Sequence, residues 1–143
     1  MKIGIITHHY IKNYGAFWQA YALWEVLKEI FSSHDVCIIN YKNDKHFLAN
    51  TRPFFIRKPY DCNIKKNICL YIAGLKQFIY FTKSLELLRL SKNMKSVTDI
   101  NKEQFDVVII GSDEVWNTDA VGVDKIKFGL GLEAKKIVSY AAS

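Results

Sequence analysis

The residues best suited to chemistry lie in one short stretch, 111–117, which reads Gly-Ser-Asp-Glu-Val-Trp-Asn. Asp113 and Glu114 are acids that act as a general base when water is excluded from them. Trp116 offers a flat surface on which a sugar ring can stack, and the amide of Asn117 both donates to and accepts from hydroxyl groups. The same pattern also fits a helix cap followed by a tryptophan in the core, so both interpretations stay open.

A second stretch whose residues could take part in chemistry is the loop from Thr7 to Gly15. His8 and His9 are candidates for a proton donor or a phosphate contact, and the alternative is one buried and one solvated histidine. The loop leads into the start of a predicted helix, where unpaired backbone N–H groups and the helix dipole favour anions. The loop has neither the GxGxxG nor the Walker A pattern, which argues against dinucleotide-binding and P-loop proteins.

Strands must carry both loops to the same edge of a sheet. Short apolar runs predict strands at Lys2–Thr7, Asp35–Asn40, Phe105–Ile110 and Lys136–Ala141, and a helical pattern covers Gly15–Phe31. Runs that are apolar throughout are typical of parallel strands buried on both faces. The order strand, helix, strand predicts an α/β fold, a Rossmann-like three-layer domain with a mostly parallel sheet that binds ligands beyond the carboxyl ends of its strands.

The aromatic residues of the first helix and the cysteine of the second strand are interpreted as structural. The aromatic residues recur at helical spacing, which predicts core packing rather than a cofactor site; they are Phe17, Trp18, Tyr21 and Trp24. Cys37 lies within the second strand and is predicted to be an inert buried thiol.

The middle of the chain is less regular. Tyr41–Tyr60 is polar, basic and interrupted by two prolines, which predicts a loop, whereas Asn63–Leu90 has the spacing of one or two helices. Its stretch Ile68–Phe81 is too short to span a membrane, and core burial is favoured over an interfacial position or a partner helix. A short helix is predicted at Val97–Gln104, with Thr98 as its cap.

Length and composition indicate one ordinary domain. The chain has 143 residues, half of them apolar, and no run long enough for a signal-peptide core or a membrane span, which favours the cytoplasm. Its three cysteines, Cys37, Cys62 and Cys69, lack paired-metal spacing, so neither a disulfide scaffold nor a structural zinc site is expected.

The positive charge is concentrated in the middle. The chain carries a formal net charge of +6, while residues 41–96 contain twelve Lys and Arg against three acids, or +9, which leaves −3 for the rest. No nucleic-acid motif accompanies this charge, so a solvated surface is favoured and no nucleic-acid partner is expected. A peripheral contact with the anionic inner face of a membrane is a weaker hypothesis.

Three segments together resemble the polysaccharide pyruvyl transferase family. They are Lys2–Thr7 followed by Asn13–Ala16 and Gln19–Leu23, then Asp106–Asn117, then Lys136–Ser143. The set is specific in order and spacing, and it covers essentially all of this chain but less than half of a typical family member. Glu114 stands where the family often has glutamine, which adds one negative charge.

The resemblance implies a two-domain architecture of the GT-B type, with two Rossmann-like halves facing across a cleft. Members move the enolpyruvyl unit of phosphoenolpyruvate onto two hydroxyls of a glycan or lipid-linked oligosaccharide, without a further cofactor. Residues 1–143 would then be an incomplete, apparently truncated N-terminal domain, with a basic insert at about 41–96. The donor-binding C-terminal domain would be absent, so the chain alone is expected to be inactive.

The resemblance also suggests roles for individual residues. Asp113 would be the acid/base or acceptor-orienting group, with Trp116 and Asn117 as acceptor contacts. The other matching residues would line the cleft: Asn13, Tyr14, Gly15, Gln19, Gly111, Ser112 and Tyr140. Two other functions stay open, a GT-B-like glycosyltransferase that uses a nucleotide sugar and an inactive, truncated sugar- or anion-binding module.

Overall fold

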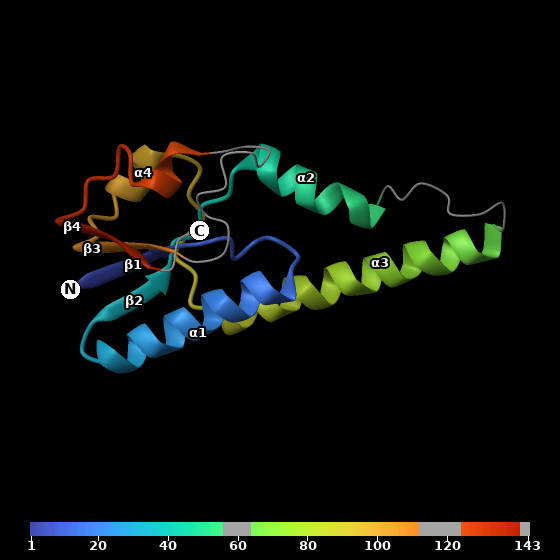
Figure 1. Ribbon diagram of the computed structural model, residues 1–143, viewed down its shortest axis with the longest axis horizontal. Helices are drawn as coiled ribbons and strands as arrows, with labels where there is room; N and C mark the ends of the chain where they lie inside the picture. Colours follow the sequence, from blue (N-terminus) through green and yellow to red (C-terminus); the bar gives the residue numbers. More distant parts are fainter. Residues whose placement is uncertain (56–63, 112–123, 141–143) are drawn as a thin grey trace.

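The computed structural model describes residues 1–55, 64–111 and 124–140. Within them, four strands form one sheet: β1 (Lys2–Ile6), β2 (Asp35–Ile38), β3 (Val107–Gly111) and β4 (Lys136–Tyr140) (Figure 1). The strands lie in the order β2-β1-β3-β4, and every neighbouring pair is parallel. All four predicted strands are confirmed, and with them the α/β class and the parallel sheet.

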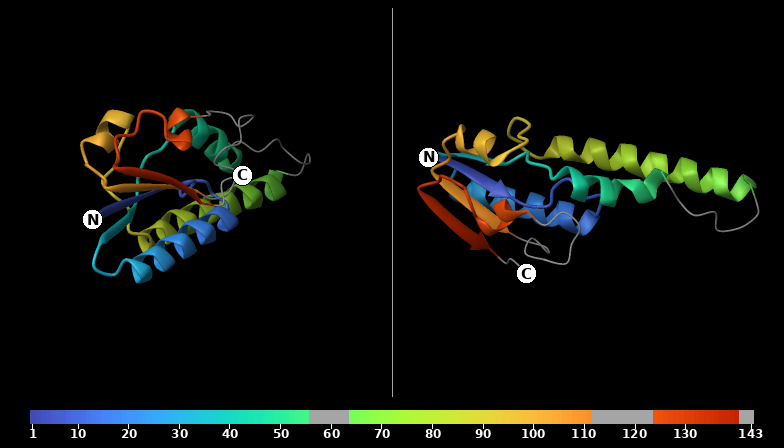
Figure 2. Two further views of the ribbon diagram at one scale, coloured as in Figure 1. Left: turned by 60° about the vertical axis from the view of Figure 1, so that its left-hand side comes forward. Right: turned by 90° about the horizontal axis from the view of Figure 1, so that it is seen from above.

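Helices cover both faces of this sheet and make two separate apolar cores (Figure 2). The helix α1 (Tyr14–Ile30) packs on one face, while α4 (Val97–Asn101) and the 3-10 helix η2 (Lys125–Phe128) lie on the other. Successive strand residues point to opposite faces, so Ile5 enters the α1 core and Ile6 enters the opposite core. This arrangement of helix, sheet and helix agrees with the predicted three-layer domain.

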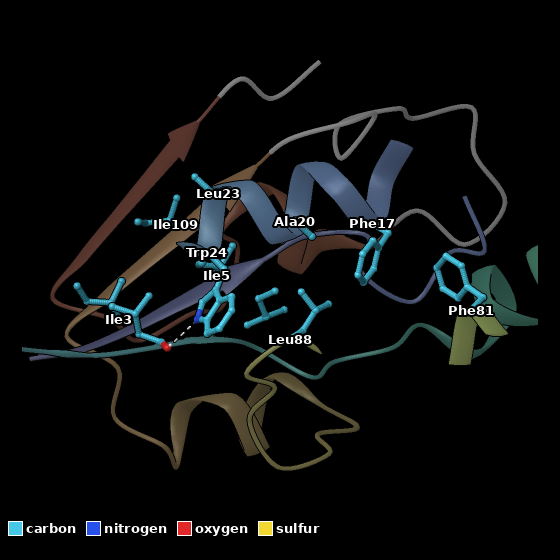
Figure 3. Packing of buried hydrophobic residues seen from close by; sticks show 11 residues of the cluster. Ile3, Ile5, Phe17, Ala20, Leu23, Trp24, Phe81, Leu88 and Ile109 are labelled. Carbon is cyan, nitrogen blue, oxygen red and sulfur yellow. Dashed lines mark hydrogen bonds between the residues drawn. The ribbon is translucent and has the colours of Figure 1, made fainter. Parts of the chain in front are cut away.

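The core on the α1 side contains part of the predicted aromatic set (Figure 3). Phe17 and Trp24 are buried, and the indole N–H of Trp24 donates to the carbonyl oxygen of Val36 at 3.1 Å. Tyr21 packs against the same core at its margin. Trp18 is 57% exposed, because it stands about 100° around the helix from Phe17. Core packing is therefore confirmed for Phe17 and Trp24 and wrong for Trp18.

The predicted loop at Tyr41–Tyr60 is wrong over most of its length, because α2 occupies Asp44–Phe55. Asn43 stabilises the start of α2, since its side-chain oxygen accepts a hydrogen bond from the backbone N–H of His46 at 3.1 Å. Pro53 is the third-last residue of α2, and without an N–H it cannot donate to the carbonyl oxygen four residues earlier, that of Ala49.

The predicted helical segment is confirmed as α3 (Ile64–Ser84), which continues into the short 3-10 helix η1 (Leu85–Leu87). Phe81 is buried and joins the α1 core. The predicted core burial of the stretch is otherwise wrong, because α3 runs out past the end of the sheet (Figures 1 and 2). Five of its large side chains are at least 46% exposed: Ile68, Tyr71, Ile72, Ile79 and Tyr80.

The short helix α4 begins where predicted but uses a different cap. Ser96 has an extended backbone, and its hydroxyl oxygen accepts a hydrogen bond from the N–H of Asp99 at 3.2 Å. Thr98 lies inside the helix, so its assignment as the cap is wrong.

Cys37 is buried in β2, as predicted. Burial raises the pKa of its thiol to about 11, so the reactive thiolate is scarce at neutral pH. This agrees with the interpretation of Cys37 as an inert core residue.

Candidate functional site

The sheet order places a natural ligand crevice between β1 and β3. β1 leads along the chain to β2 on one side, whereas β3 leads to β4 on the other, so the order reverses between these two neighbours. Ile6 pairs in register with Ile110, and both strands therefore end at the same edge. The two loops singled out in the sequence thus leave the sheet side by side, as the ligand-binding hypothesis requires.

The loop that follows β3 contains most of the predicted acceptor-binding residues, and these lie outside the described residues: Ser112, Asp113, Glu114, Trp116 and Asn117. Gly111, the last residue of β3, is described and pairs with Tyr140. A Cβ atom on Gly111 would lie 2.1 Å from the carbonyl oxygen of Tyr140. Close packing of two strands therefore explains this glycine without any ligand.

Four polar side chains gather just past the end of β1, and we call them the His–Lys cluster: His8, Tyr10, His46 and Lys127. Each is at most 8% exposed. Nζ of Lys127 lies 3.0 Å from Nε2 of His8, and Nδ1 of His46 lies 3.1 Å from the hydroxyl oxygen of Tyr10. The rings of His8 and His46 are 4.8 Å apart between centroids. The cluster therefore joins the loop after β1 to α2 and η2.

At neutral pH the cluster combines the ammonium of Lys127 with two neutral hydrogen-bonding groups, the imidazole of His46 and the phenol of Tyr10. Burial lowers the pKa of Lys127 to about 8, an effect that Asp124 partly opposes. Burial and the charge of Lys127 both lower the pKa of His46, which keeps that imidazole neutral. Burial raises the pKa of Tyr10 to about 12. An ammonium can only donate, so its contact with His8 requires Nε2 to be an unprotonated acceptor.

Asp124 fixes the position of Lys127 from the other side. One carboxylate oxygen accepts a hydrogen bond from the N–H of Ile126 at 3.2 Å and so caps η2. The other accepts from the hydroxyl of Tyr41 and from the side-chain amide of Asn43, the latter at 3.2 Å. Burial and this hydrogen bond raise the pKa of Tyr41. Two hydrogen bonds, from Tyr41 and Asn43, therefore tie the capping residue of η2 to the segment that follows β2.

His9 belongs to a separate buried pair. Its side chain is fully buried, with Nδ1 3.3 Å from the carbonyl oxygen of Thr7 and Nε2 3.3 Å from Oδ1 of Asn40. Burial lowers the pKa of His9 to about 4, although both hydrogen bonds oppose the shift. His8 is also buried, so the alternative of one buried and one solvated histidine is wrong. His9 connects β1 to the end of β2 and has a structural role.

The remaining residues predicted in the first loop lie at the start of α1. Asn13 caps the helix, because its side-chain oxygen accepts a hydrogen bond from the N–H of Gly15 at 2.8 Å. Tyr14 is 49% exposed, with its ring 5.9 Å from that of Phe81. Helix capping is therefore enough to explain an asparagine at position 13, while the exposed ring of Tyr14 is accessible to a ligand.

Two predicted residues lie elsewhere. Gln19 on α1 and Tyr140 on β4 both line an open apolar groove of about 850 Å³ between that helix and the uncovered face of β3 and β4. Of the predicted site residues that are described, His8 therefore belongs to the His–Lys cluster, Gln19 and Tyr140 line the groove, and the others lie apart from both.

Sequence reasoning missed His46 and Lys127. His46 fell in a segment predicted as a loop, and no element was predicted around Lys127. A signal for Lys127 was present in its apolar neighbours, Ile126 and Phe128, and in the capping residue Asp124 before them. Within the described residues, no group of three or more His, Cys, Asp or Glu side chains could hold a metal ion.

Comparison with known proteins identifies the family. The family model described as polysaccharide pyruvyl transferase matches residues 13–143. No curated protein and no solved structure matches the chain. The match begins at Asn13, the first residue of the motif at the start of α1, and includes the stretch 111–117, whereas His8 and His9 precede it. The chain therefore belongs to the polysaccharide pyruvyl transferase family.

Proposed function

We propose that this chain is the N-terminal part of a transferase that builds a pyruvate ketal on a sugar of a cell-surface polysaccharide. The observation that carries this proposal is the family match over residues 13–143, combined with a buried cationic cluster at the carboxyl end of β1. A carboxylate or phosphate oxygen is the natural ligand of such a cluster. Phosphoenolpyruvate carries both groups.

The reaction joins two acceptor hydroxyls to one carbon. Both hydroxyl oxygens form bonds to C2 of phosphoenolpyruvate, and the bond from C2 to the phosphate oxygen breaks. One hydroxyl proton is transferred in net terms to the methylene carbon, which becomes a methyl group. The other leaves with inorganic phosphate. The enzyme must therefore deprotonate hydroxyls and stabilise a departing dianion.

In this proposal the His–Lys cluster stabilises negative charge. Lys127 contacts an anionic oxygen of the donor, and His8 orients the ammonium through its unprotonated Nε2. A pKa near 8 leaves Lys127 mostly protonated at neutral pH while keeping proton exchange accessible. Asp113 remains our proposed acid/base or acceptor-orienting group, with Trp116 and Asn117 as proposed acceptor contacts.

The proposed architecture has two Rossmann-like halves of the GT-B type, of which this chain supplies one. The apolar groove beside α1 supports further packing there, because the faces of a parallel sheet are normally covered by helices. In this architecture most donor contacts come from the second half.

The test is release of inorganic phosphate from phosphoenolpyruvate with a panel of glycan acceptors. The assay compares this chain with a form extended past Ser143, and the extended form with its Lys127→Met and Asp113→Asn variants. We expect acceptor-dependent release from the extended form only, lowered at least about ten-fold by each substitution, with exposed Lys125→Met as the matched control.

Two other outcomes would contradict the proposal. Transfer from a nucleotide sugar, without phosphate release from phosphoenolpyruvate, would identify a glycosyltransferase. Sugar binding by the chain, without turnover of either donor by either form, would identify a binding module. Normal phosphate release by the Lys127→Met variant would show that the His–Lys cluster takes no part in the mechanism. It would not contradict the proposed reaction itself.

A further inference from the structure

The helix α3 presents an apolar stripe to solvent. Ile68, Ile72 and Ile79 are 52%, 46% and 51% exposed, and Leu75 between them is half-buried. Their spacing of four, three and four residues places all four on one side of the helix. We call these four residues the α3 stripe. Phe81, the residue that anchors α3 in the core, faces away from the stripe.

The helix is long and extends past the sheet. It spans Ile64–Ser84, its N-terminal part extends well past the sheet, and α2 packs against it (Figures 1 and 2). Within the described residues, no helix combines the length and apolar character needed to cross a bilayer. A flat surface can therefore approach the α3 stripe along its length without meeting the sheet.

The charge of α3 is entirely positive. The helix contains Lys65, Lys66, Lys76 and Lys83 and no acidic residue. Lys76 and Lys83 are exposed, and helical geometry places both beside the α3 stripe, within about 90° of its centre. Tyr71 and Tyr80 are also exposed, at 48% and 64%. Apolar side chains flanked by lysine and tyrosine are typical of a helix that lies in a membrane interface.

We propose that α3 docks this protein on the surface of an anionic phospholipid bilayer. The α3 stripe enters the boundary between headgroups and acyl chains, while Lys76 and Lys83 extend to the lipid phosphates. The basic balance of residues 41–96, twelve Lys and Arg against three acids, adds long-range attraction to the same surface.

Charge argues against a second copy of the chain as the occupant. Pairing two α3 stripes would bring the lysines of both helices together, with no acid on either helix to offset them. An anionic bilayer can bury the apolar stripe and also pair with the flanking lysines. The inference does not rest on the proposed reaction, since it uses neither the His–Lys cluster nor the loop after β3.

The experiment is co-sedimentation with vesicles of phosphatidylcholine alone and of phosphatidylcholine mixed with phosphatidylglycerol. We expect the chain to bind the anionic vesicles, to bind phosphatidylcholine vesicles at least about ten-fold less, and to dissociate as salt is raised. The variant Ile72→Glu/Ile79→Glu should lose at least ten-fold in binding, because it places two charges on the stripe. Lys76→Glu/Lys83→Glu should lose at least as much, since each lysine near an anionic surface is worth about five-fold.

A matched control separates the stripe from general charge effects. Leu130→Glu/Lys125→Glu changes one exposed leucine, 58% exposed, and one exposed lysine beside η2, on the opposite side of the sheet from α1. This variant should bind anionic vesicles within about three-fold of the unsubstituted chain. Circular dichroism of every variant checks that the fold is kept, as expected for substitutions at exposed positions.

Several results would overturn the proposal. Equal binding to both vesicle types, no binding to either, or equal loss in the control variant would each do so. A dimer in light scattering that Ile72→Glu/Ile79→Glu abolishes would assign the stripe to self-association instead. Capture by an acidic helical peptide, with no binding to vesicles, would assign it to a protein partner.

Discussion

Nζ of Lys127 lies 3.0 Å from Nε2 of His8, although 119 residues separate the two in the chain. The contact forms because β1 ends beside η2, which Asp124 caps and holds. Both side chains are buried, at 8% and 3% exposure, and burial disfavours the protonated form of Lys127 by lowering its pKa. A buried cation in such a place lowers stability, which is a common property of functional sites.

Replacement of Lys127 by methionine should therefore stabilise the fold at neutral pH. The pKa of Lys127 is about 8 in the folded protein and close to 10.5 in the unfolded chain. Between these values the unfolded chain binds the proton more tightly, so the stability of the unsubstituted protein falls as pH drops from 10.5 to 8 and stays reduced below that. We expect Lys127→Met to gain about 1–3 kcal/mol at pH 7 and little at pH 10.5.

Urea unfolding of both proteins at the two pH values checks this difference. The exposed neighbour Lys125→Met is the control and should change stability by less than about 0.5 kcal/mol. A loss of stability in Lys127→Met at pH 7 would show that the ammonium makes net favourable interactions in the fold.

The buried ring of His9 should make the fold sensitive to acid. Its pKa is about 4 in the folded protein against 6.5 for an unperturbed histidine, because burial disfavours the charged ring. The stability due to the neutral ring is complete above pH 6.5 and is lost as pH falls from 6.5 to 4. We expect a loss of roughly 3 kcal/mol over this range.

The measurement is the free energy of unfolding of the chain and of His9→Gln at pH 7 and pH 4.5. The variant should be less stable at pH 7 but should lose less stability on acidification. Identical acid profiles for the unsubstituted chain and His9→Gln would assign the acid sensitivity to other groups.

The strands and the first helix were predictable because local patterns decide them. Apolar runs such as Val107–Gly111 and the helical spacing of Phe17 and Trp24 are properties of neighbouring residues. That the carboxyl ends of β1 and β3 lie at one edge of the sheet followed from the parallel α/β pattern, whereas their direct pairing is a finding of the structure.

The composition of the site was not predictable in the same way. His46 and Lys127 reach His8 through contacts between segments far apart in the chain, which no local pattern records. The prediction that α3 is buried was wrong for a related reason. Ile72 and Ile79 have the spacing of core residues, but the helix extends beyond the sheet that would cover them. Periodicity shows that a face is apolar and leaves open what covers it.

Asn13 was predicted to line the cleft and is found capping α1, and the two roles can be separated. Asn13→Ala removes the acceptor for the N–H of Gly15 and should cost about 1 kcal/mol of stability. Asn13→Ser keeps a capping oxygen and should restore most of that loss. Denaturant unfolding of the three proteins measures the cap.

Ligand binding measures the other role of Asn13. If the residue only caps α1, Asn13→Ser should bind a glycan acceptor as the unsubstituted extended form does. A serine variant with full stability and at least ten-fold weaker acceptor binding would show that the amide of Asn13 contacts the ligand directly.

Gly111→Ala should detach β4 from the sheet. Gly111 pairs with Tyr140, and a Cβ atom there would lie 2.1 Å from the carbonyl oxygen of that residue, so backbone must move to admit it. We expect a loss of about 2–3 kcal/mol of stability. Hydrogen exchange should also become faster at the β4 amides, Lys136–Tyr140, than at those of β1.

The matched control for Gly111→Ala is Gly15, where an added methyl group would press on a side-chain atom rather than on backbone. A Cβ atom on Gly15 would meet only the side chain of Asn13, at 3.1 Å, and the residue stands in the first turn of α1. Gly15→Ala should therefore change stability by less than about 1 kcal/mol, since alanine is the better helix former. Normal stability and hydrogen exchange in Gly111→Ala would mean that the β3 and β4 backbones separate without cost. Close packing would then not explain Gly111, and a role in ligand binding would be favoured instead.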